Sequence, residues 1–386
     1  MTRLLYIANL RLPTEKAYGI QIARMCEAFA STATTNNQRP TTNDRNLEIE
    51  LIVPRRENEI KDDFFEYYSI KRNFKFKKFW APDFYFPGRL DRISVLAKDL
   101  ISAVILVFYG IFSGADIIYS RDEWPLYFVS FLKKNIVFEA HRFSPKRNLF
   151  YTRFRNKKIK TVVISEALKQ EFLKLGFRQE NILVAHDGVD LDEFDIPISK
   201  NEARDRVGLP QDAKIVMYTG HLFTWKGSDT LAMAAKLLPE VKFVFVGGTN
   251  HDLTVFRKKF GSESNIMILG HKPHKEIPVF LKAADVLVLP NSAKEEISHF
   301  TSPIKLFEYM ASGRPIVATN LPSIREVLND KNSILAKPDD INSLAQGIRR
   351  VLDNNIPDKE LAKKAREDVE NYTWAKRASS ILNFLG

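Results

Sequence analysis

Short apolar runs alternate with longer amphipathic segments along most of the chain. The apolar runs are only a few residues long and nearly continuous, which is typical of strands buried on both faces of a parallel sheet. The segments between them carry apolar residues at helical spacing, so the pattern predicts repeated β-α units and an α/β fold. We expect strands at Leu4–Ala8, Ile49–Val53, Asp116–Ser120, Ile136–Glu139, Thr161–Ile164 and Ile182–Ala185, and then at Ile215–Thr219, Lys242–Val246, Asn265–Leu269, Val286–Leu289, Ile316–Thr319 and Ser333–Ala336.

This number of strands, in a chain of 386 residues, is too large for one core and predicts two doubly wound parallel-sheet domains. The segment 195–201, DIPISKN, has a proline and no periodic apolar face, so it is the predicted hinge. The segment 31–46 is almost free of large apolar side chains and predicts a mobile surface loop. Ligands of doubly wound sheets bind beyond the carboxyl ends of the strands, so the important motifs should follow strands.

Composition narrows the possible partners. The formal charge is +11, with 58 Lys and Arg against 47 Asp and Glu, and the excess is spread over both halves of the chain. A basic protein can bind nucleic acid, an anionic membrane or phosphorylated substrates, and since no nucleic-acid motif is present, the last two are favoured. Cys26 is the only cysteine, which excludes an internal disulfide and suits the cytoplasm. No signal peptide is expected before the first strand.

Two segments bear on a membrane contact. Residues 100–115, LISAVILVFYGIFSGA, carry no charge but are fewer than the ~18–20 needed to cross a bilayer, so we expect a buried helix. Residues 70–86, IKRNFKFKKFWAPDFYF, mix lysines with aromatic side chains and can dock on anionic headgroups. The alternative is an edge strand or loop whose aromatic residues pack inward while its lysines stay solvated. The expected location is cytoplasmic, with or without a peripheral contact on the inner face of the membrane.

The stretch 301–322, TSPIKLFEYMASGRPIVATNLP, predicts a loop, a helix and a buried strand, with Pro303 in the first turn of the helix. Thr301 and Ser302 offer hydroxyl and backbone N–H groups at the helix start, where an anion such as a diphosphate is favoured. Glu308 lies about a turn and a half further on, where it can accept hydrogen bonds from two vicinal hydroxyls, as on a ribose. The stretch therefore predicts a site for a nucleoside diphosphate.

This stretch closely resembles the donor-binding segment of the family 4 retaining nucleotide-sugar glycosyltransferases, and the resemblance covers nearly the whole chain. It implies the GT-B architecture, in which two Rossmann-like domains face each other across a cleft. The expected domains are residues 1–194 with a returning helix at 373–386, and residues 195–372, although from sequence alone that helix can equally cap the second domain. In the family, two glutamates are separated by seven residues. Glu308 matches the second, which holds the ribose, and Phe300 replaces the first, which contacts the transferred sugar.

Two loops of the expected first domain resemble family motifs as well. Gly19, in ANLRLPTEKAYGIQIARM, precedes a helix expected from Ile20, and the matching family loop contributes to binding the donor diphosphate and the acceptor. A lone glycine equally suits an ordinary tight turn. His141, in IVFEAHRF, closes a buried strand, and the resemblance places it by the donor sugar, where it can donate to a hydroxyl or the leaving phosphate.

In the second domain, the segment YTGHLFTWKGSDTLAMAAKLL turns at Gly220, and Lys226 precedes a helix, so a cation and free N–H groups can converge on one anion. Family members carry an arginine five residues before this lysine, and His221 takes that position here. A neutral histidine supplies less positive charge than an arginine. Lys226 is therefore expected to provide more of the stabilisation of the leaving diphosphate. The resemblance implies further donor contacts from Gly270, His271, Lys272 and Asn291.

These motifs predict a glycosyltransferase with His141, Lys226 and Glu308 as its catalytic residues. The resemblance implies a UDP- or GDP-linked sugar donor, retention of configuration, and a hydroxyl acceptor on a lipid-linked or surface polysaccharide precursor. No metal or other cofactor is expected, because neither a DXD pair nor a His/Cys ligand cluster is evident. Two other classes stay open. One is a nucleotide-sugar 2-epimerase of the same fold, and the other is a non-catalytic binder of sugar nucleotides or membrane surfaces.

Overall fold

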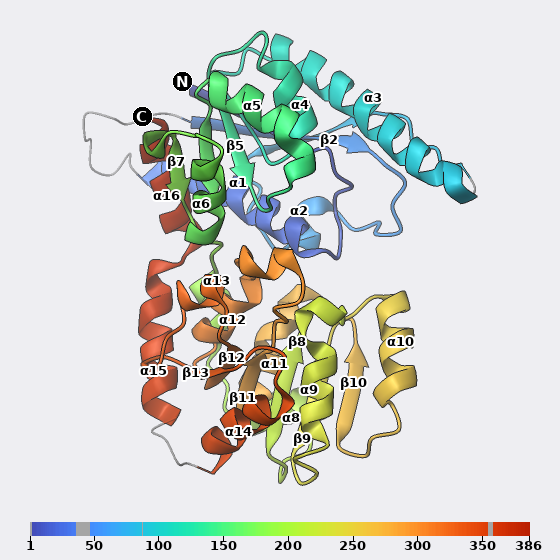
Figure 1. Ribbon diagram of the computed structural model, residues 1–386, viewed down its shortest axis with the longest axis vertical. Coiled ribbons are helices and arrows are strands. Elements are labelled where there is room, and N and C mark those ends of the chain that lie inside the picture. The colour runs from blue at the N-terminus through green and yellow to red at the C-terminus, as the bar shows by residue number, and fades with distance from the viewer. Residues whose placement is uncertain (1, 36–46, 87, 354–357) are drawn as a thin grey trace. The chain divides into compact units, whose positions relative to one another are not determined.

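The computed structural model describes residues 2–35, 47–86, 88–353 and 358–386 and divides the chain into two units (Figure 1). The first unit comprises Met1–His186 with Trp374–Gly386, and the second comprises Asp187–Thr373. Each unit has one sheet, and all strand pairs among the described residues are parallel. The predicted α/β class with two Rossmann-like sheets is therefore confirmed.

The first unit is built on a sheet of seven strands in the order β3-β2-β1-β4-β5-β6-β7. Its strands are β1 (Thr2–Ile7), β2 (Leu47–Arg55), β3 (Lys75–Trp80), β4 (Ile117–Ser120), β5 (Ile136–Ala140), β6 (Lys160–Val163) and β7 (Ile182–Val184). Its helices are α1 (Ala17–Thr35), α2 (Phe64–Tyr67), α3 (Asp91–Phe112), α4 (Glu123–Val129), α5 (Asn148–Asn156), α6 (Glu166–Lys174) and α16 (Trp374–Leu385).

The order of the strands places these helices in two layers. From β3 to β7 the chain advances across the sheet in one direction, and right-handed crossovers put α3, α4, α5 and α6 on one face. The chain runs in the opposite direction from β1 to β2, so α1 covers the other face, where α16 packs against it. Within the first layer α4 lies between α3 and α5 (Figure 1).

The second unit has a sheet of six strands in the order β10-β9-β8-β11-β12-β13. Its strands are β8 (Ile215–Thr219), β9 (Lys242–Val246), β10 (Ile266–Gly270), β11 (Val286–Leu289), β12 (Ile316–Thr319) and β13 (Ile334–Ala336). Its helices are α7 (Leu191–Phe194), α8 (Lys200–Val207), α9 (Ser228–Ala235), α10 (Asn250–Phe260), α11 (Ile277–Ala283), α12 (Ile304–Ala311), α13 (Pro322–Arg325), α14 (Ile341–Leu352) and α15 (Asp358–Asp368). Apolar clusters fill both sides of this sheet.

The basic and aromatic segment 70–86 contains the edge strand β3. Lys77 forms an ion pair of 2.6 Å with Glu50 on the neighbouring strand, and the Phe76 ring stacks on Phe64 at 4.1 Å. Lysines on an edge strand discourage pairing with another chain. The segment is therefore in part an edge strand with inward-packing aromatic residues, while Trp80, Tyr85 and Phe86 are exposed, and its contact with a membrane stays a prediction.

Two expectations for helices are wrong. The apolar segment 100–115 is not a buried helix, because α3 begins at Asp91 and buries only one of its faces. Apolar content along a helix does not reveal which faces find a partner. The surface loop expected at 31–46 is wrong for residues 31–35, which belong to α1, and residues 36–46 lie outside the described part of the chain.

Candidate active site

Three neighbouring strands of the second unit end in glycines that approach each other closely. The N–H of Gly247 donates to the carbonyl of Gly270 at 2.7 Å, and a Cβ on Gly247 would lie 2.4 Å from the Gly220 oxygen. Gly220 and Gly247 both have φ near +121°, which favours glycine. The carboxyl ends of β8, β9 and β10 are therefore lined by backbone, which is the place where such sheets bind ligands. Gly247 was not among the residues predicted from sequence, although it belongs to a Gly-Gly pair directly after a predicted strand.

The loop that carries Lys226 is held against the loop that follows β11. Gly227 has φ of +75°, and a Cβ there would lie 1.7 Å from the Pro290 carbonyl oxygen, so only glycine fits. The N–H of Ser292 donates to the carbonyl of Trp225 at 3.1 Å. These contacts place the predicted residues Lys226 and Asn291 on adjoining loops, at the carboxyl ends of adjacent strands.

Asn291 is fully buried, and neither its Oδ1 nor its Nδ2 has a hydrogen-bond partner among the described residues. Its backbone carbonyl accepts a hydrogen bond from Thr319 Oγ1 at 2.8 Å, which holds the loop in place. A buried amide without partners costs free energy, so such groups usually meet a ligand or an ordered water. The side chain of Asn291 is thus available to a polar ligand.

Two lysines lie close together beside the backbone of these glycines. Lys226 Nζ lies 3.9 Å from the centre of the Trp225 ring, and burial lowers the pKa of Lys226 to about 8. Lys305 Nζ donates to the Thr219 carbonyl at 3.2 Å, and burial, reinforced by the charge of Lys226, holds the pKa of Lys305 well below its ordinary value. In the described part of the chain, neither ammonium has a carboxylate within ion-pair distance. Two neighbouring cations of this kind are an anion-binding arrangement.

Lys305 was not predicted as a site residue, although its spacing from Glu308 was a signal in the sequence. Lys305 and Glu308 are three residues apart on α12, so they share one face of that helix. Nothing in the sequence alone indicated that Thr219 and Lys226 would lie beside this face.

Glu308 is almost completely buried, and its Oε1 accepts a hydrogen bond from His274 Nε2 at 2.7 Å. The other ring nitrogen of His274 lies 3.3 Å from Glu193 Oε1. Burial alone would lower the pKa of His274, but the hydrogen bonds to Glu193 and Glu308 raise it to about 9, so the ring is cationic at neutral pH. His274 was missed because its partners are distant in sequence. Its hydrogen bond engages Oε1 of Glu308 and so orients this carboxylate.

The other predicted residues of the second unit have different surroundings. The His221 ring stacks on Phe223 at 4.9 Å, and its Nδ1 lies 3.9 Å from Asp252 Oδ2. His221 is thus held by neighbours of its own loop and α10, and its part in donor binding stays a prediction. His271 is exposed, and Lys272 Nζ lies 5.9 Å from the Phe280 ring centre.

At the start of α12 the expected geometry differs in one respect. Pro303 precedes the helix as its N-cap, with an extended backbone, and the first helical residue is Ile304. Ser302 Oγ accepts from the Asp187 N–H at 3.1 Å, so this hydroxyl ties down the start of the second unit. Thr301 is partly exposed beside it.

In the first unit, the predicted histidine is part of a buried network around Glu139. His141 Nε2, Gln21 Nε2 and Arg377 Nη2 each lie 2.7 Å from Glu139 Oε1. Burial would raise the pKa of Glu139, but these partners and Tyr119 hold it well below its ordinary value. Burial and the charge of Arg121 lower the pKa of His141 to about 4. The neutral ring donates from Nε2 to the carboxylate, which leaves Nδ1 as an acceptor.

Gly19 lies inside α1, which begins at Ala17 and not near Ile20 as expected. A Cβ at this position would lie 2.1 Å from the Tyr68 hydroxyl and 2.7 Å from Thr14 Cγ2. Close packing against Tyr68 thus explains the glycine without a ligand.

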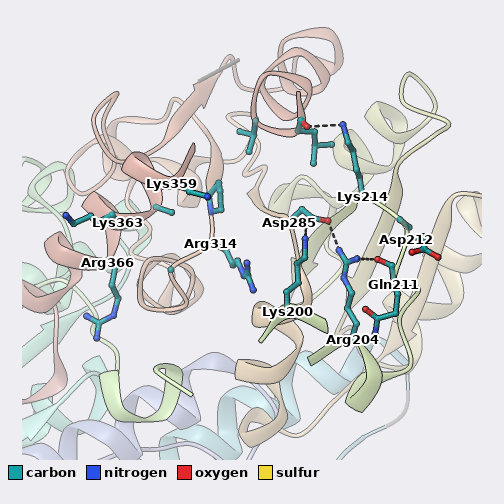
Figure 2. Close-up of a pocket in the computed structure, with 16 residues that line it drawn as sticks. Lys200, Arg204, Gln211, Asp212, Lys214, Asp285, Arg314, Lys359, Lys363 and Arg366 are labelled. Atoms are coloured by element: carbon teal, nitrogen blue, oxygen red, sulfur yellow. Dashed lines mark hydrogen bonds and ion pairs between the residues drawn. The ribbon is translucent and has the colours of Figure 1, made fainter. Parts of the chain in front are cut away.

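A separate pocket of the second unit lies at the opposite, amino ends of the strands (Figure 2). Arg204 is buried there and donates to Asp285 Oδ2 at 2.6 Å, while the Ile215 N–H donates to the same oxygen at 2.7 Å. These bonds fasten α8 to the beginnings of β8 and β11. This pocket lies at the opposite end of the sheet from Gly220, Gly247 and Gly270, and ligands of such sheets bind at the carboxyl ends of the strands. We therefore assign the pocket a structural role.

The two Rossmann-like units define the GT-B class of fold. Residues 199–368 match the model of the family described as glycosyl transferases group 1. An uncharacterized glycosyltransferase of Methanocaldococcus jannaschii is 28% identical over 233 residues, covering 58% of each chain. A D-inositol 3-phosphate glycosyltransferase of Xylanimonas cellulosilytica is 28% identical over 222 residues, covering 54% of this chain and 52% of the relative. The chain spans about half the length of the curated relatives it matches.

Solved structures are similar over the whole chain. Sucrose-phosphate synthase from Thermosynechococcus elongatus has a TM-score of 0.75 at 17% identity, covering 99% of this chain and 98% of that one. The Anabaena protein HepE, solved in complex with UDP and glucose, has a TM-score of 0.72 at 18% identity, covering 99% of both chains. The resemblance to family 4 glycosyltransferases that the motifs indicated is thereby confirmed.

Proposed function

We propose that this protein transfers a glycosyl group from a nucleoside diphosphate sugar to a hydroxyl acceptor. The observation that carries the proposal is the pair Lys226 and Lys305 at the carboxyl ends of the second unit's strands, two cations that pair with no carboxylate of the described residues. A diphosphate supplies the negative charge that this pair lacks. The matched family and the curated relatives bear glycosyltransferase names, which favours transfer over epimerisation or binding alone.

The donor site follows from the side chains around the two lysines. The diphosphate would lie between Lys226 and Lys305 over the backbone of Gly220. The ribose hydroxyls would donate to Glu308 Oε2, since His274 occupies Oε1. The buried amide of Asn291 would bind an oxygen of the diphosphate. A UDP- or GDP-linked sugar satisfies each of these groups, and HepE, with a similar fold, was solved with UDP.

In the transfer step the bond between the anomeric carbon and the diphosphate breaks, and a bond to the acceptor oxygen forms. The acceptor proton passes to the leaving phosphate, so that charge and atoms balance. Lys226 and Lys305 stabilise the charge that grows on the departing diphosphate. This assigns to two side chains the task that a metal ion performs in other enzymes, so the proposed reaction needs no metal. Retention of the anomeric configuration is part of the proposal by family resemblance.

In the first unit, His141 is proposed to bind a sugar hydroxyl. Its Nδ1 is an acceptor while Nε2 donates to Glu139, so it would accept a hydrogen bond from a sugar hydroxyl. This differs from the donor role that the sequence suggested. The acceptor is proposed to be a lipid-linked or surface polysaccharide precursor reached on the cytoplasmic side of a membrane.

The test is incubation of the full chain with labelled UDP- and GDP-sugars and a panel of hydroxyl acceptors, with the anomeric configuration of the product read by NMR. We expect transfer or slow hydrolysis of one donor in the presence of a chelator. Lys305→Met should raise the Kd of the nucleoside diphosphate by about 10- to 100-fold, because one charge-assisted contact is lost.

Lys258→Met is the matched control, since Lys258 is exposed on α10. Its donor affinity should equal that of the wild type. Donor binding by Lys305→Met as tight as that of the control would refute the anion site. Epimerised donor without transfer would refute the transferase assignment.

A further inference from the structure

The helix α3 of the first unit presents an apolar outer face to solvent. Phe108 is 66% exposed and Phe112 is 72% exposed, although both are large apolar side chains. The outer face of α3 consists of Ile93, Leu96, Ile101, Val104, Phe108 and Phe112, all of them exposed. At 1.5 Å per residue this face is about 28 Å long. A continuous apolar strip of this size on a soluble surface usually marks an interaction site.

The inner face of α3 is fixed to the sheet. At Gly110 the helix approaches the sheet so closely that a Cβ would lie 3.3 Å from Ile7 Cδ1. Lys98 points inward and donates to Asp83 Oδ1 at 3.1 Å, and Arg56 donates to Ser102 Oγ at 3.2 Å. Leu106 and Val107 also face the protein, whereas Ile101, Val104, Phe108 and Phe112 face outward.

By length and composition α3 is able to cross a membrane, with one third of its most apolar window buried. Crossing would require the helix to leave Asp83, Arg56 and the sheet contact at Gly110, which would expose part of the core. The geometry instead suits a helix that lies in the plane of a membrane interface, with its apolar side in the acyl boundary.

Positive charge is concentrated next to α3. Residues 121–160, which include α4 and α5, contain eleven Lys and Arg against three Asp and Glu, a net charge of +8. This exceeds the charge excess of the whole chain up to Asp195, which is 31 against 25. Arg121 and Lys160 bond to α1 and α16 on the opposite face, but the cations of α4, α5 and the turn between α4 and β5, such as Lys133, Lys134 and Arg153, lie in the same layer as α3. Phe131 and Leu132, directly followed by Lys133 and Lys134, are also exposed there.

We propose that the outer face of α3 docks into the interface of an anionic lipid bilayer, with the cations of α4, α5 and the adjoining Lys133 and Lys134 contacting the headgroups. Anionic lipid complements this charge, and each basic residue near such a surface adds to the attraction. A second copy of the chain is the other candidate to cover α3. A symmetric dimer through this layer would bring the same net positive segment against itself, which is repulsive.

The proposed membrane contact therefore lies on α3 and its neighbours and not on residues 70–86, where the sequence suggested it. Lys75 and Lys77 of β3 pair with Glu48 and Glu50, whereas the outer face of α3 has nothing packed on it within the described chain. The proposal does not rest on the transfer reaction, since membrane docking and donor binding are measured separately and involve different units.

The experiment is co-sedimentation of the full chain with phosphatidylcholine vesicles, with and without phosphatidylserine. We expect binding to the anionic vesicles that weakens as salt is raised. Replacing Val104, Phe108 and Phe112 by Ser together should lower the partition coefficient about 100-fold, at roughly 5-fold per lost side chain. The control is Leu237→Ser with Val255→Ser, which removes exposed apolar side chains from the second unit and should leave binding unchanged.

A second variant tests the charge. Lys133→Glu with Lys134→Glu should weaken binding to anionic vesicles at least 10-fold and reduce its salt dependence. Thermal unfolding midpoints equal to the wild type would show that both variants are folded. Three results would overturn the proposal: equal binding to neutral and anionic vesicles, wild-type binding by the triple serine variant, or a solution dimer that this variant dissociates. UDP and GDP binding by the triple serine variant reports on the donor site independently.

Discussion

His274 holds the carboxylate that we assign to the ribose, so its replacement tests the candidate site most directly. In His274→Gln the cation between Glu193 and Glu308 is lost, and two largely buried carboxylates remain near each other. A glutamine keeps some hydrogen-bonding capacity but brings no charge. Both the free energy of unfolding and donor affinity should therefore respond to the substitution.

The magnitude follows from the pKa of His274. It is about 9 in the folded protein against an ordinary value of 6.5, and one pKa unit corresponds to 1.36 kcal/mol, so the protonated ring stabilises the fold by about 3 kcal/mol. Because the pKa is raised by folding, this stabilisation is fully present below pH 6.5. It decreases as the pH rises and is lost above pH 9.

The assay is urea unfolding of the wild type and His274→Gln at a series of pH values from 6 to 9.5. The difference in their unfolding free energies should shrink by about 3 kcal/mol across this range. His251→Gln is the control, because His251 is exposed on α10, and its difference from the wild type should stay flat. A difference between wild type and His274→Gln that does not change with pH would refute the assigned charge state.

Donor binding gives a second readout. Glu308 in His274→Gln is no longer oriented, so the Kd for the nucleoside diphosphate should rise by about 10-fold, whereas His251→Gln should bind normally. An unchanged Kd in His274→Gln would show that His274 does not position Glu308 for the ligand.

Three further expectations concern single positions. Gly227→Ala should lower the unfolding free energy by about 3 kcal/mol, since its Cβ would meet a carbonyl oxygen at 1.7 Å, whereas Gly208→Ala, with open space and φ of +69°, should cost only about 1 kcal/mol in the same urea titration. Arg377→Met leaves the Glu139 carboxylate buried without this cation, and calorimetry should show a loss of about 3–5 kcal/mol. The His141 ring should titrate in NMR near pH 4, and a midpoint near 6.5 would contradict its assigned environment.

The strands were largely predictable from sequence because buried parallel strands leave continuous apolar runs. Ile215–Thr219, Lys242–Val246 and Val286–Leu289 begin and end at the predicted residues. Edge strand β3 was harder to identify, because it mixes lysines with aromatic residues and so lacks a continuous apolar run. The lysines protect the exposed edge of the sheet, and Phe76 packs inward.

Parts of the site were predictable for a similar reason. The site residues that were predicted follow strands or lie on the helix between two strands, as Lys226, Asn291 and Glu308 do. Such positions can be recognised in the sequence by their spacing from the predicted strands. His274 and Lys305 needed the folded chain, because their importance comes from Glu193, Thr219 and Lys226, which other loops bring beside them.

By itself, the sequence determined the α/β class, the alternation of elements and the residues that follow the strands, because these depend on local patterns of apolar and polar side chains. Only the tertiary structure decided which face of α3 is covered, which second lysine lies beside Lys226, and which tautomer His141 adopts. Each of these depends on the free energy of burying a particular group beside particular neighbours, and those neighbours are set by how distant segments pack.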